Sequence, residues 1–292
     1  MIRLIPSAAL FAALWLACWP ACWPACWPAV APTSCTAQDV QPDTVTIPQN
    51  AADFHLFLLV GQSNMAGRGK VEEQDRKVHP RIVMLNKAGQ WVPATDPLHF
   101  DKPAIVGTGL GKTFALDYAN AHPDVTVGLI PCAVGGSPIA TWEPGAYDAP
   151  TKTHPWDDML PRARKAMEAG TLKGILWHQG ESDSKAELSD VYAEKFHALI
   201  ARFRTELKVP DVPFVAGQMG QFDERPWDEH RRKVDNVHRS LPQQVPNTAF
   251  AGSEGLNHKG DQVHFDSASY RELGHRYFVA WRSLMSTSAA NR

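Results

Sequence analysis

The sequence predicts an α/β protein in which helices cover both faces of a parallel five-stranded sheet, a three-layer α/β/α sandwich. Short apolar runs alternate along the chain with longer amphipathic stretches. Strands that alternate with helices of this length form right-handed βαβ crossovers and hence parallel sheets. No second polar linker interrupts the alternation after residue 53, which favours a single large domain.

The expected strands are short and almost wholly apolar. In residues 54–60 six of seven residues are apolar, as in a strand that is covered on both faces. The other four strands are expected at 125–130, 173–177, 212–216 and 248–251. A shorter strand at 81–85 and a hairpin-like segment at 87–91 precede them.

The expected helices lie between the strands. Residues 187–207 carry apolar side chains at the i, i+3, i+4 spacing of an amphipathic helix, among them Tyr192, Leu199 and Phe203. The remaining helices are expected at 108–121, 155–169, 228–241 and 267–284.

The first 31 residues have the composition of a secretory signal peptide. Arg3 is their only charged residue, residues 4–16 are mostly apolar, and residues 29–31 offer small side chains for cleavage. We expect cleavage between residues 31 and 37, then a polar linker to residue 52, the main domain at 53–286 and a tail at 287–292. This predicts export to the periplasm or the extracellular space without stable membrane insertion; lipid attachment at Cys18 is the alternative.

Charge and cysteine content exclude several classes of protein. The formal net charge is -2 and the basic residues are scattered, so nucleic acid is not an expected partner. Of five cysteines, Cys18, Cys22 and Cys26 lie in the predicted signal peptide. Cys35 and Cys132 remain, which predicts neither a disulfide framework nor a Cys-x-x-Cys zinc site.

Ser63 follows the first apolar run within Gly61-Gln-Ser63-Asn64-Met65. In open α/β sheets ligands bind at the carboxyl ends of the strands, so a serine at this point is placed for chemistry. An alternative is that Ser63 caps the next helix. The motif is not the Gly-x-Ser-x-Gly elbow of α/β-hydrolases, because Met65 stands where that motif has glycine.

Two further strands end in polar loops, and parallel strands bring all these loops to one edge of the sheet. Gly135-Gly136-Ser137 follows the second strand, and His178-Gln179-Gly-Glu181 follows the third. Backbone N–H groups of Ser63 and Gly136 and the side-chain amide of Gln179 are candidate donors to an oxyanion. A plain turn is the alternative for the two glycines.

The loop before the last helix contains Asp261-x-x-His264. At this spacing the carboxylate can accept a hydrogen bond from one ring nitrogen of His264 while the other faces Ser63, as nucleophilic catalysis requires. The alternative is that His264 is an ordinary member of the 12 histidines of the chain.

These blocks, in this order, resemble the SGNH hydrolase superfamily, and within it the branch of the sialate O-acetylesterases and carbohydrate esterase family 6 (acetylxylan esterase). The similarity spans residues 54–283. It implies a flavodoxin-like SGNH hydrolase fold, Ser63 as nucleophile, Gly136 and Gln179 in the oxyanion hole, and Asp261 with His264 as triad partners. Glu181 is an alternative acid, a substrate ligand or a structural residue, and Asn64 is expected to tie the loops of the site together or to contact substrate.

The sequence therefore predicts a secreted, cofactor-independent serine esterase that removes O-acetyl groups from carbohydrates of the acetylxylan or sialate type. Four tryptophans near these loops are candidates for stacking on sugar rings, with a place in the core as the alternative: Trp142, Trp156, Trp177 and Trp227. Two alternatives remain. One is a metal-dependent hydrolase with ligands among His178, Glu181, Asp183, Asp261 and His264; the other is a catalytically inactive carbohydrate-binding protein.

Overall fold

The computed structural model describes residues 45–290, with side chains up to residue 286. The predicted signal peptide and Cys18 lie outside the described residues, as do residues 32–44 of the predicted linker. The described part of that linker packs on the domain: Val45 and Ile47 contact the hydrophobic core. Among the described helices, none is long and apolar enough to cross a membrane.

The sheet has seven strands in the order β3-β2-β4-β1-β5-β6-β7. Their bounds are Phe54–Gly61 for β1, Ile82–Leu85 for β2, Trp91–Pro93 for β3, Thr126–Pro131 for β4, Thr171–His178 for β5, Phe214–Gly217 for β6 and Thr248–Ala251 for β7. All neighbours pair in parallel except β2 and β3, which are antiparallel.

The predicted number of five strands is therefore wrong, although the fold class is confirmed. The two short segments after Ser63 extend the sheet instead of lying outside it. A tight turn after Asn86, whose backbone N–H donates to the carbonyl of Gln90 at 2.9 Å, returns the chain alongside β2. Pro93 is tolerated because β3 is an edge strand and needs no donor on its outer side.

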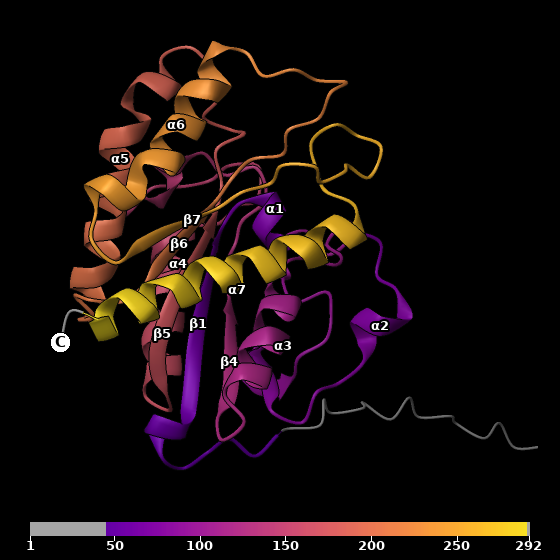
Figure 1. Cartoon of the computed structure of the whole chain (residues 1–292), viewed down its shortest axis with the longest axis vertical. Coiled ribbons are helices and arrows are strands. Elements are labelled where there is room, and N and C mark those ends of the chain that lie inside the picture. The colour runs from indigo at the N-terminus through magenta and orange to yellow at the C-terminus, as the bar shows by residue number, and fades with distance from the viewer. Residues whose placement is uncertain (1–44, 291–292) are drawn as a thin grey trace, which may run out of the picture. The chain divides into compact units, whose positions relative to one another are not determined.

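The major helices are α3 (Gly111–Ala121), α4 (Pro155–Met167), α5 (Leu188–Glu206), α6 (Glu229–Gln244) and α7 (Ser267–Ala290), with short helices α1 (Ser63–Ala66) and α2 (Glu73–Arg76) and 3-10 turns η1 (Ala51–Asp53) and η2 (Ile139–Trp142). Helices α3 and α7 cover one face of the sheet and α4, α5 and α6 the other (Figure 1). Each predicted helix is present, and α7 extends beyond its predicted end.

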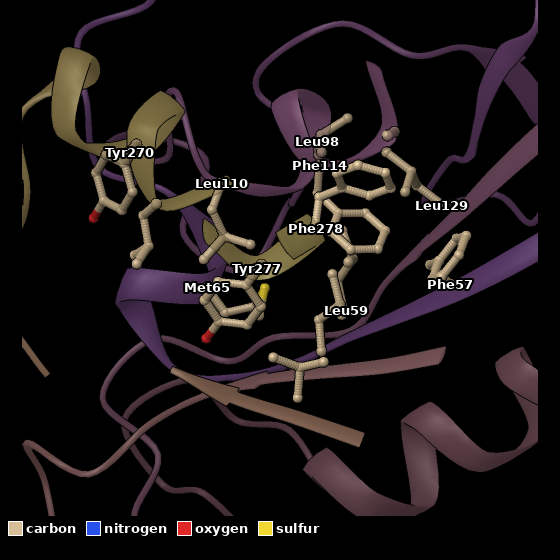
Figure 2. Close-up of a cluster of buried hydrophobic side chains, with 14 of the residues drawn as sticks. Phe57, Leu59, Met65, Leu98, Leu110, Phe114, Leu129, Tyr270, Tyr277 and Phe278 are labelled. Atoms are coloured by element: carbon tan, nitrogen blue, oxygen red, sulfur yellow. The ribbon is translucent and has the colours of Figure 1, made fainter. Parts of the chain in front are cut away.

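Strand β1 lies at the centre of the sheet and separates two cores. Phe57 and Leu59 point to the core under α3 and α7, where they meet Phe114 and Phe278 (Figure 2). Leu56 and the other alternate residues point to the core under α4, α5 and α6. Burial on both faces explains why the run is continuously apolar, and it fixes the end of β1, where Ser63 lies.

Candidate active site

The ends of β1 and β5 lie unusually close together. Gly61 has φ of 125°, and a side chain at this position would collide with the carbonyl oxygen of His178. The same carbonyl accepts the N–H of Gln62 at 2.8 Å. Glycine is therefore required at position 61, and it allows Ser63, the first residue of α1, to lie beside the loop that follows β5.

Ser63, His264 and Asp261 form one hydrogen-bonded chain. The distance from Ser63 Oγ to His264 Nε2 is 3.0 Å, and that from His264 Nδ1 to Asp261 Oδ2 is 2.7 Å. Ser63 is 7% exposed, so its hydroxyl is reachable without being freely solvated. The arrangement places a base next to a hydroxyl and an acid behind the base, which is the geometry of an activated serine nucleophile.

The backbone orients the carboxylate of Asp261. Its Oδ1 accepts the N–H of Val263 at 3.0 Å and that of His264 at 2.8 Å. Partial burial acts to raise the pKa of Asp261, but the hydrogen bonds from His264 and Val263 outweigh it and lower the pKa to about 2. Asp261 is thus an anion at neutral pH and can hold the proton of His264 on Nδ1, which leaves Nε2 free to accept one from Ser63.

Asn64 joins three parts of the site. Its Nδ2 donates to Glu181 Oε1 at 2.6 Å and to the carbonyl of Val263 at 3.0 Å, and its Oδ1 accepts from the hydroxyl of Tyr270 at 2.6 Å. The side chain is fully buried. Asn64 therefore links α1 to the loop that carries His264.

Glu181 contacts Asn64, whereas Asp261 contacts His264. The second carboxylate oxygen of Glu181, Oε2, is buried and has no hydrogen-bond partner among the described residues. Of the two candidate acids, the structure thus brings Asp261 to the ring nitrogen of His264, and Glu181 lies behind Asn64.

Residues 134–137 form a tight turn after β4. The N–H of Ser137 donates to the carbonyl of Val134 at 3.2 Å, and Gly136 has φ of 85°. Gly136 is exposed and Ser137 is fully buried. Because Val134 N donates to the carbonyl of Gly61 at 3.0 Å, the turn lies against the end of β1, on the side of Ser63 opposite to β5.

The amide of Gln179 is occupied by other groups. Its Nε2 donates to the carbonyl of Ser137 at 3.2 Å and to Asp183 Oδ2, and its Oε1 accepts from the hydroxyl of Tyr192 at 2.8 Å. The side chain is fully buried. To donate to an oxyanion, the amide of Gln179 would have to release either the carbonyl of Ser137 or the carboxylate of Asp183. In this structure its hydrogen bond to Ser137 holds the turn after β4.

The candidate metal ligands do not gather at one point. The described residues hold no group of three or more His, Cys, Asp or Glu side chains placed to share an ion. His178 Nδ1 bonds the hydroxyl of Tyr277 at 3.0 Å, and Asp183 accepts the N–H of Ile139 at 2.8 Å. Each predicted ligand outside the Asp261–His264 pair thus has a separate partner.

Three of the four tryptophans proposed for sugar stacking are core residues, so that expectation is wrong for them. Trp142, Trp156 and Trp177 are at most 2% exposed. All three belong to the core under α4, α5 and α6, with Trp142 at the end of η2, Trp156 at the start of α4 and Trp177 in β5. Trp227 is partly exposed, and its ring N–H donates to the carbonyl of Gly220 at 2.9 Å.

Three residues near the turn were not predicted from the sequence. Arg68 and Asp101 form a buried ion pair beside Gly135. Lys102 Nζ lies 3.7 Å from the place that a side-chain carbon on Gly136 would take. The sequence carried one weak signal for Arg68, its position between Gly67 and Gly69, and none for the pairing with residue 101.

A cavity of about 500 Å³ adjoins the same turn. Its lining includes Phe100, Asp101, Val134 and Arg162. The guanidinium of Arg162 lies 4.9 Å above the centre of the Phe100 ring. The cavity is thus lined by an aromatic ring and by polar side chains, a combination found in sites for polar organic ligands.

A family described as "Carbohydrate esterase, sialic acid-specific acetylesterase" matches residues 53–283. This range contains every site residue named above. Among curated proteins, the chain is similar to a probable carbohydrate esterase of Arabidopsis thaliana, with 30% identity over 253 residues, which covers 78% of this chain and 88% of that protein. These matches confirm the resemblance that the sequence motifs predicted.

Solved structures with similar folds include an Arabidopsis thaliana protein, with a TM-score of 0.69, 28% identity and coverage of 78% of this chain and 98% of that chain. NanS matches with a TM-score of 0.66, 19% identity and coverage of 83% and 100%. A carbohydrate acetylesterase from Xanthomonas citri matches with a TM-score of 0.59, 21% identity and coverage of 80% and 56%. At these identities NanS and the Xanthomonas protein show a likeness of fold alone.

Proposed function

The chain belongs to the sialic acid-specific acetylesterase family of carbohydrate esterases and is a carboxylic ester hydrolase, and from this premise we propose that it removes O-acetyl groups from a carbohydrate through an acyl-enzyme on Ser63. The observation that carries the proposal is the hydrogen-bonded chain from Ser63 through His264 to Asp261, with distances of 3.0 Å and 2.7 Å.

In the first half of the reaction, His264 Nε2 takes the proton of Ser63 as Oγ attacks the carbonyl carbon of the acetyl ester. The tetrahedral intermediate then collapses. The sugar oxygen takes the proton from Nε2 as it leaves. In the second half, a water molecule gives its proton to Nε2 and attacks the acetyl carbon. Acetate leaves and Ser63 recovers its proton. Asp261 stays ionised throughout and stabilises the imidazolium.

The oxyanion needs hydrogen-bond donors that are in place before the reaction. We assign this role to the backbone N–H groups of Ser63 and Gly136, which are at the start of a helix and in an exposed turn. Gln179 can contribute a third donor if one of its amide hydrogens turns away from Ser137 or Asp183. Loss of one such donor costs roughly 3 kcal/mol of transition-state stabilisation.

For the substrate, we propose an acetylated sugar that carries a carboxylate, as sialic acids do, in preference to neutral acetylxylan. Lys102 supports this choice. Its ammonium lies at the open face of Gly136, and among the described residues no hydrogen bond or ion pair holds it. An unpaired cation beside the reacting ester favours an anionic ligand through a charge-assisted hydrogen bond.

Export remains part of the proposal and rests on the sequence of the first 31 residues. N-terminal sequencing of the protein recovered from the native host would test it. A mature N-terminus between residues 32 and 38 supports cleavage by signal peptidase, whereas a lipid-modified Cys18 supports anchoring, and retention of Met1 contradicts export.

The direct test of the function is acetate release from O-acetylated sialic acid, from acetylxylan and from p-nitrophenyl acetate by the mature protein in the presence of EDTA. Wild type and Ser63→Ala should be compared at equal concentration. We expect EDTA-resistant activity that is lost in Ser63→Ala and that is highest on the sialic acid. Activity that EDTA abolishes would support the metal-dependent alternative and contradict the serine mechanism.

A further inference from the structure

The turn that carries the proposed oxyanion donor contains two successive glycines, Gly135 and Gly136, which have more conformational freedom than any other residue. With a negative φ at Gly135 and φ of 85° at Gly136, it has the form of a type II turn. Two successive glycines let the turn shift at little cost, and such a shift would move the N–H of Gly136 relative to Ser63. The orientation of the donor must therefore be fixed from outside the turn.

Asp101 supplies such a restraint. Its Oδ2 accepts the N–H of Gly135 at 2.8 Å and also accepts from Arg68 Nη2 at 2.6 Å. The Arg68 and Asp101 side chains are 1% and 2% exposed. Arg68 Nη1 donates in addition to the carbonyl of Gly67 at 2.8 Å, directly after α1. The ion pair thus connects the turn to the helix that begins at Ser63.

The fit around this pair is close. A side-chain carbon on Gly135 would collide with both Arg68 Nη2 and Asp101 Oδ2. A buried ion pair contributes little net stability, because desolvation offsets the attraction of the charges. What the pair provides is a buried acceptor for the N–H of Gly135 that Arg68 holds in place.

Ser182 restrains the other end of the same turn. Its hydroxyl donates to the carbonyl of Gly136 at 2.9 Å. The two glycines are thus held on one side by Asp101 and on the other by Ser182, while the N–H of Gly136 has no protein partner among the described residues.

We propose that Asp101, held by Arg68, is a positioning residue that keeps the turn in the place where the N–H of Gly136 faces the developing oxyanion, with Ser182 as the second restraint. The proposal rests on the proposed function, because it assumes that Gly136 serves an ester hydrolase. Asp101 itself does not touch the substrate in this account.

Two double variants test the proposal with matched charge. Arg68→Met with Asp101→Asn removes both charges and keeps an oxygen that can accept from Gly135, whereas Arg68→Met with Asp101→Leu removes both charges and the acceptor. We expect kcat for p-nitrophenyl acetate to be at least about tenfold lower in the leucine variant than in the asparagine variant, with similar KM, because small misplacements of catalytic groups cost up to about 100-fold. Equal kcat values in the two folded variants would overturn the proposal.

Ser182→Ala keeps the proposal testable if either double variant fails to fold, since Ser182 is at the surface of the site. We expect a fall in kcat of about threefold to tenfold at constant KM, in line with the loss of one neutral hydrogen bond. Unchanged kcat would contradict external restraint of the turn.

Amide hydrogen exchange supplies a readout that does not need activity. The N–H of Gly135 should exchange slowly in wild type and in the asparagine double variant, and quickly in the leucine double variant. Fast exchange of Gly135 in wild type would overturn the inference. An inert wild type with slow exchange at Gly135 would refute the proposed function and leave the restraint standing, so the two failures are distinguishable.

Discussion

His264 Nε2 lies 3.0 Å from Ser63 Oγ, although 201 positions separate the two residues in the sequence. The contact forms because β1 and the loop before α7 end at the same edge of a parallel sheet, as the ends of parallel strands do. Asn64, next to Ser63, hydrogen-bonds both Glu181 and the carbonyl of Val263 next to His264, and so links the two segments.

Substitution of the two candidate acids should separate their roles. We expect Asp261→Asn to lower kcat by about 10³- to 10⁴-fold, because an amide favours the wrong tautomer of His264 and cannot stabilise the imidazolium. Glu181→Gln keeps an oxygen that accepts from Asn64, so its kcat should fall by about tenfold or less. Steady-state kinetics of both variants on one ester decide the question. A larger loss in Glu181→Gln would assign the acid role to Glu181.

Gly136→Ala should lower kcat by about 10-fold to 100-fold with a smaller change in KM. An alanine with φ of 85° is strained, so the turn is expected to shift away from its donor geometry, whereas the methyl group itself would make only an ordinary contact with Lys102 Nζ at 3.7 Å. Gly145→Ala is the matched control, because Gly145 has φ of 76° but is surrounded by open space. Equal effects of both substitutions on kcat would show that backbone strain alone is responsible.

Lys102→Met should raise KM for O-acetylated sialic acid by about tenfold or more and leave p-nitrophenyl acetate hydrolysis within about twofold, because a charge-assisted hydrogen bond is worth roughly 1.5–3 kcal/mol. Lys102→Arg should retain most of the affinity. The control is Lys77→Met, which removes the same charge from the exposed end of α2. If Lys102→Met and Lys77→Met change the KM for the sialic acid equally, Lys102 does not bind the carboxylate.

The free energy of unfolding should depend on pH through Asp96. Burial, together with the charge of Asp75, raises the pKa of Asp96 from 3.8 to about 8. Between these two pKa values Asp96 holds a proton in the folded protein that it has lost in the unfolded chain. The free energy of unfolding is therefore greatest near pH 4 and declines as the pH rises to about 8. Asp96→Asn should flatten this decline in urea titrations at several pH values.

The control for that measurement is the exposed Asp223, since Asp223→Asn should leave the slope with pH unchanged. A slope in Asp96→Asn as steep as that of wild type would mean that Asp96 is ionised in the folded protein at neutral pH.

The parts of the fold that the sequence predicted are those with a local signal. The apolar run of β1, the stripe of Tyr192 and Phe203 on α5, and the Asp261-x-x-His264 spacing each lie within one segment and each predicted its structure. Strand β3 was missed because its three residues carry almost no periodicity and depend on pairing with β2.

Long-range packing explains the remaining differences at the site. Arg68 and Asp101 are 33 residues apart, and neither residue type at such a distance indicates a buried pair. Trp177 was considered for sugar binding because it precedes the loop after β5, but β5 alternates its side chains and turns this ring into the core. The partners of Gln179 come from the turn after β4, from its own loop and from α5, a combination that sequence spacing does not reveal.

The measurement that tests the central claim most directly is the identification of the acetylated residue during turnover. Wild-type protein would be mixed with p-nitrophenyl acetate, quenched in acid within the first turnover and digested for peptide mass spectrometry, with Ser63→Ala treated in parallel. The account predicts an acetyl group on Ser63 that is absent from the unreacted protein, and no acetylation at any site in Ser63→Ala beyond background. Turnover in wild type with Ser63 unmodified, or undiminished turnover in Ser63→Ala, would contradict it.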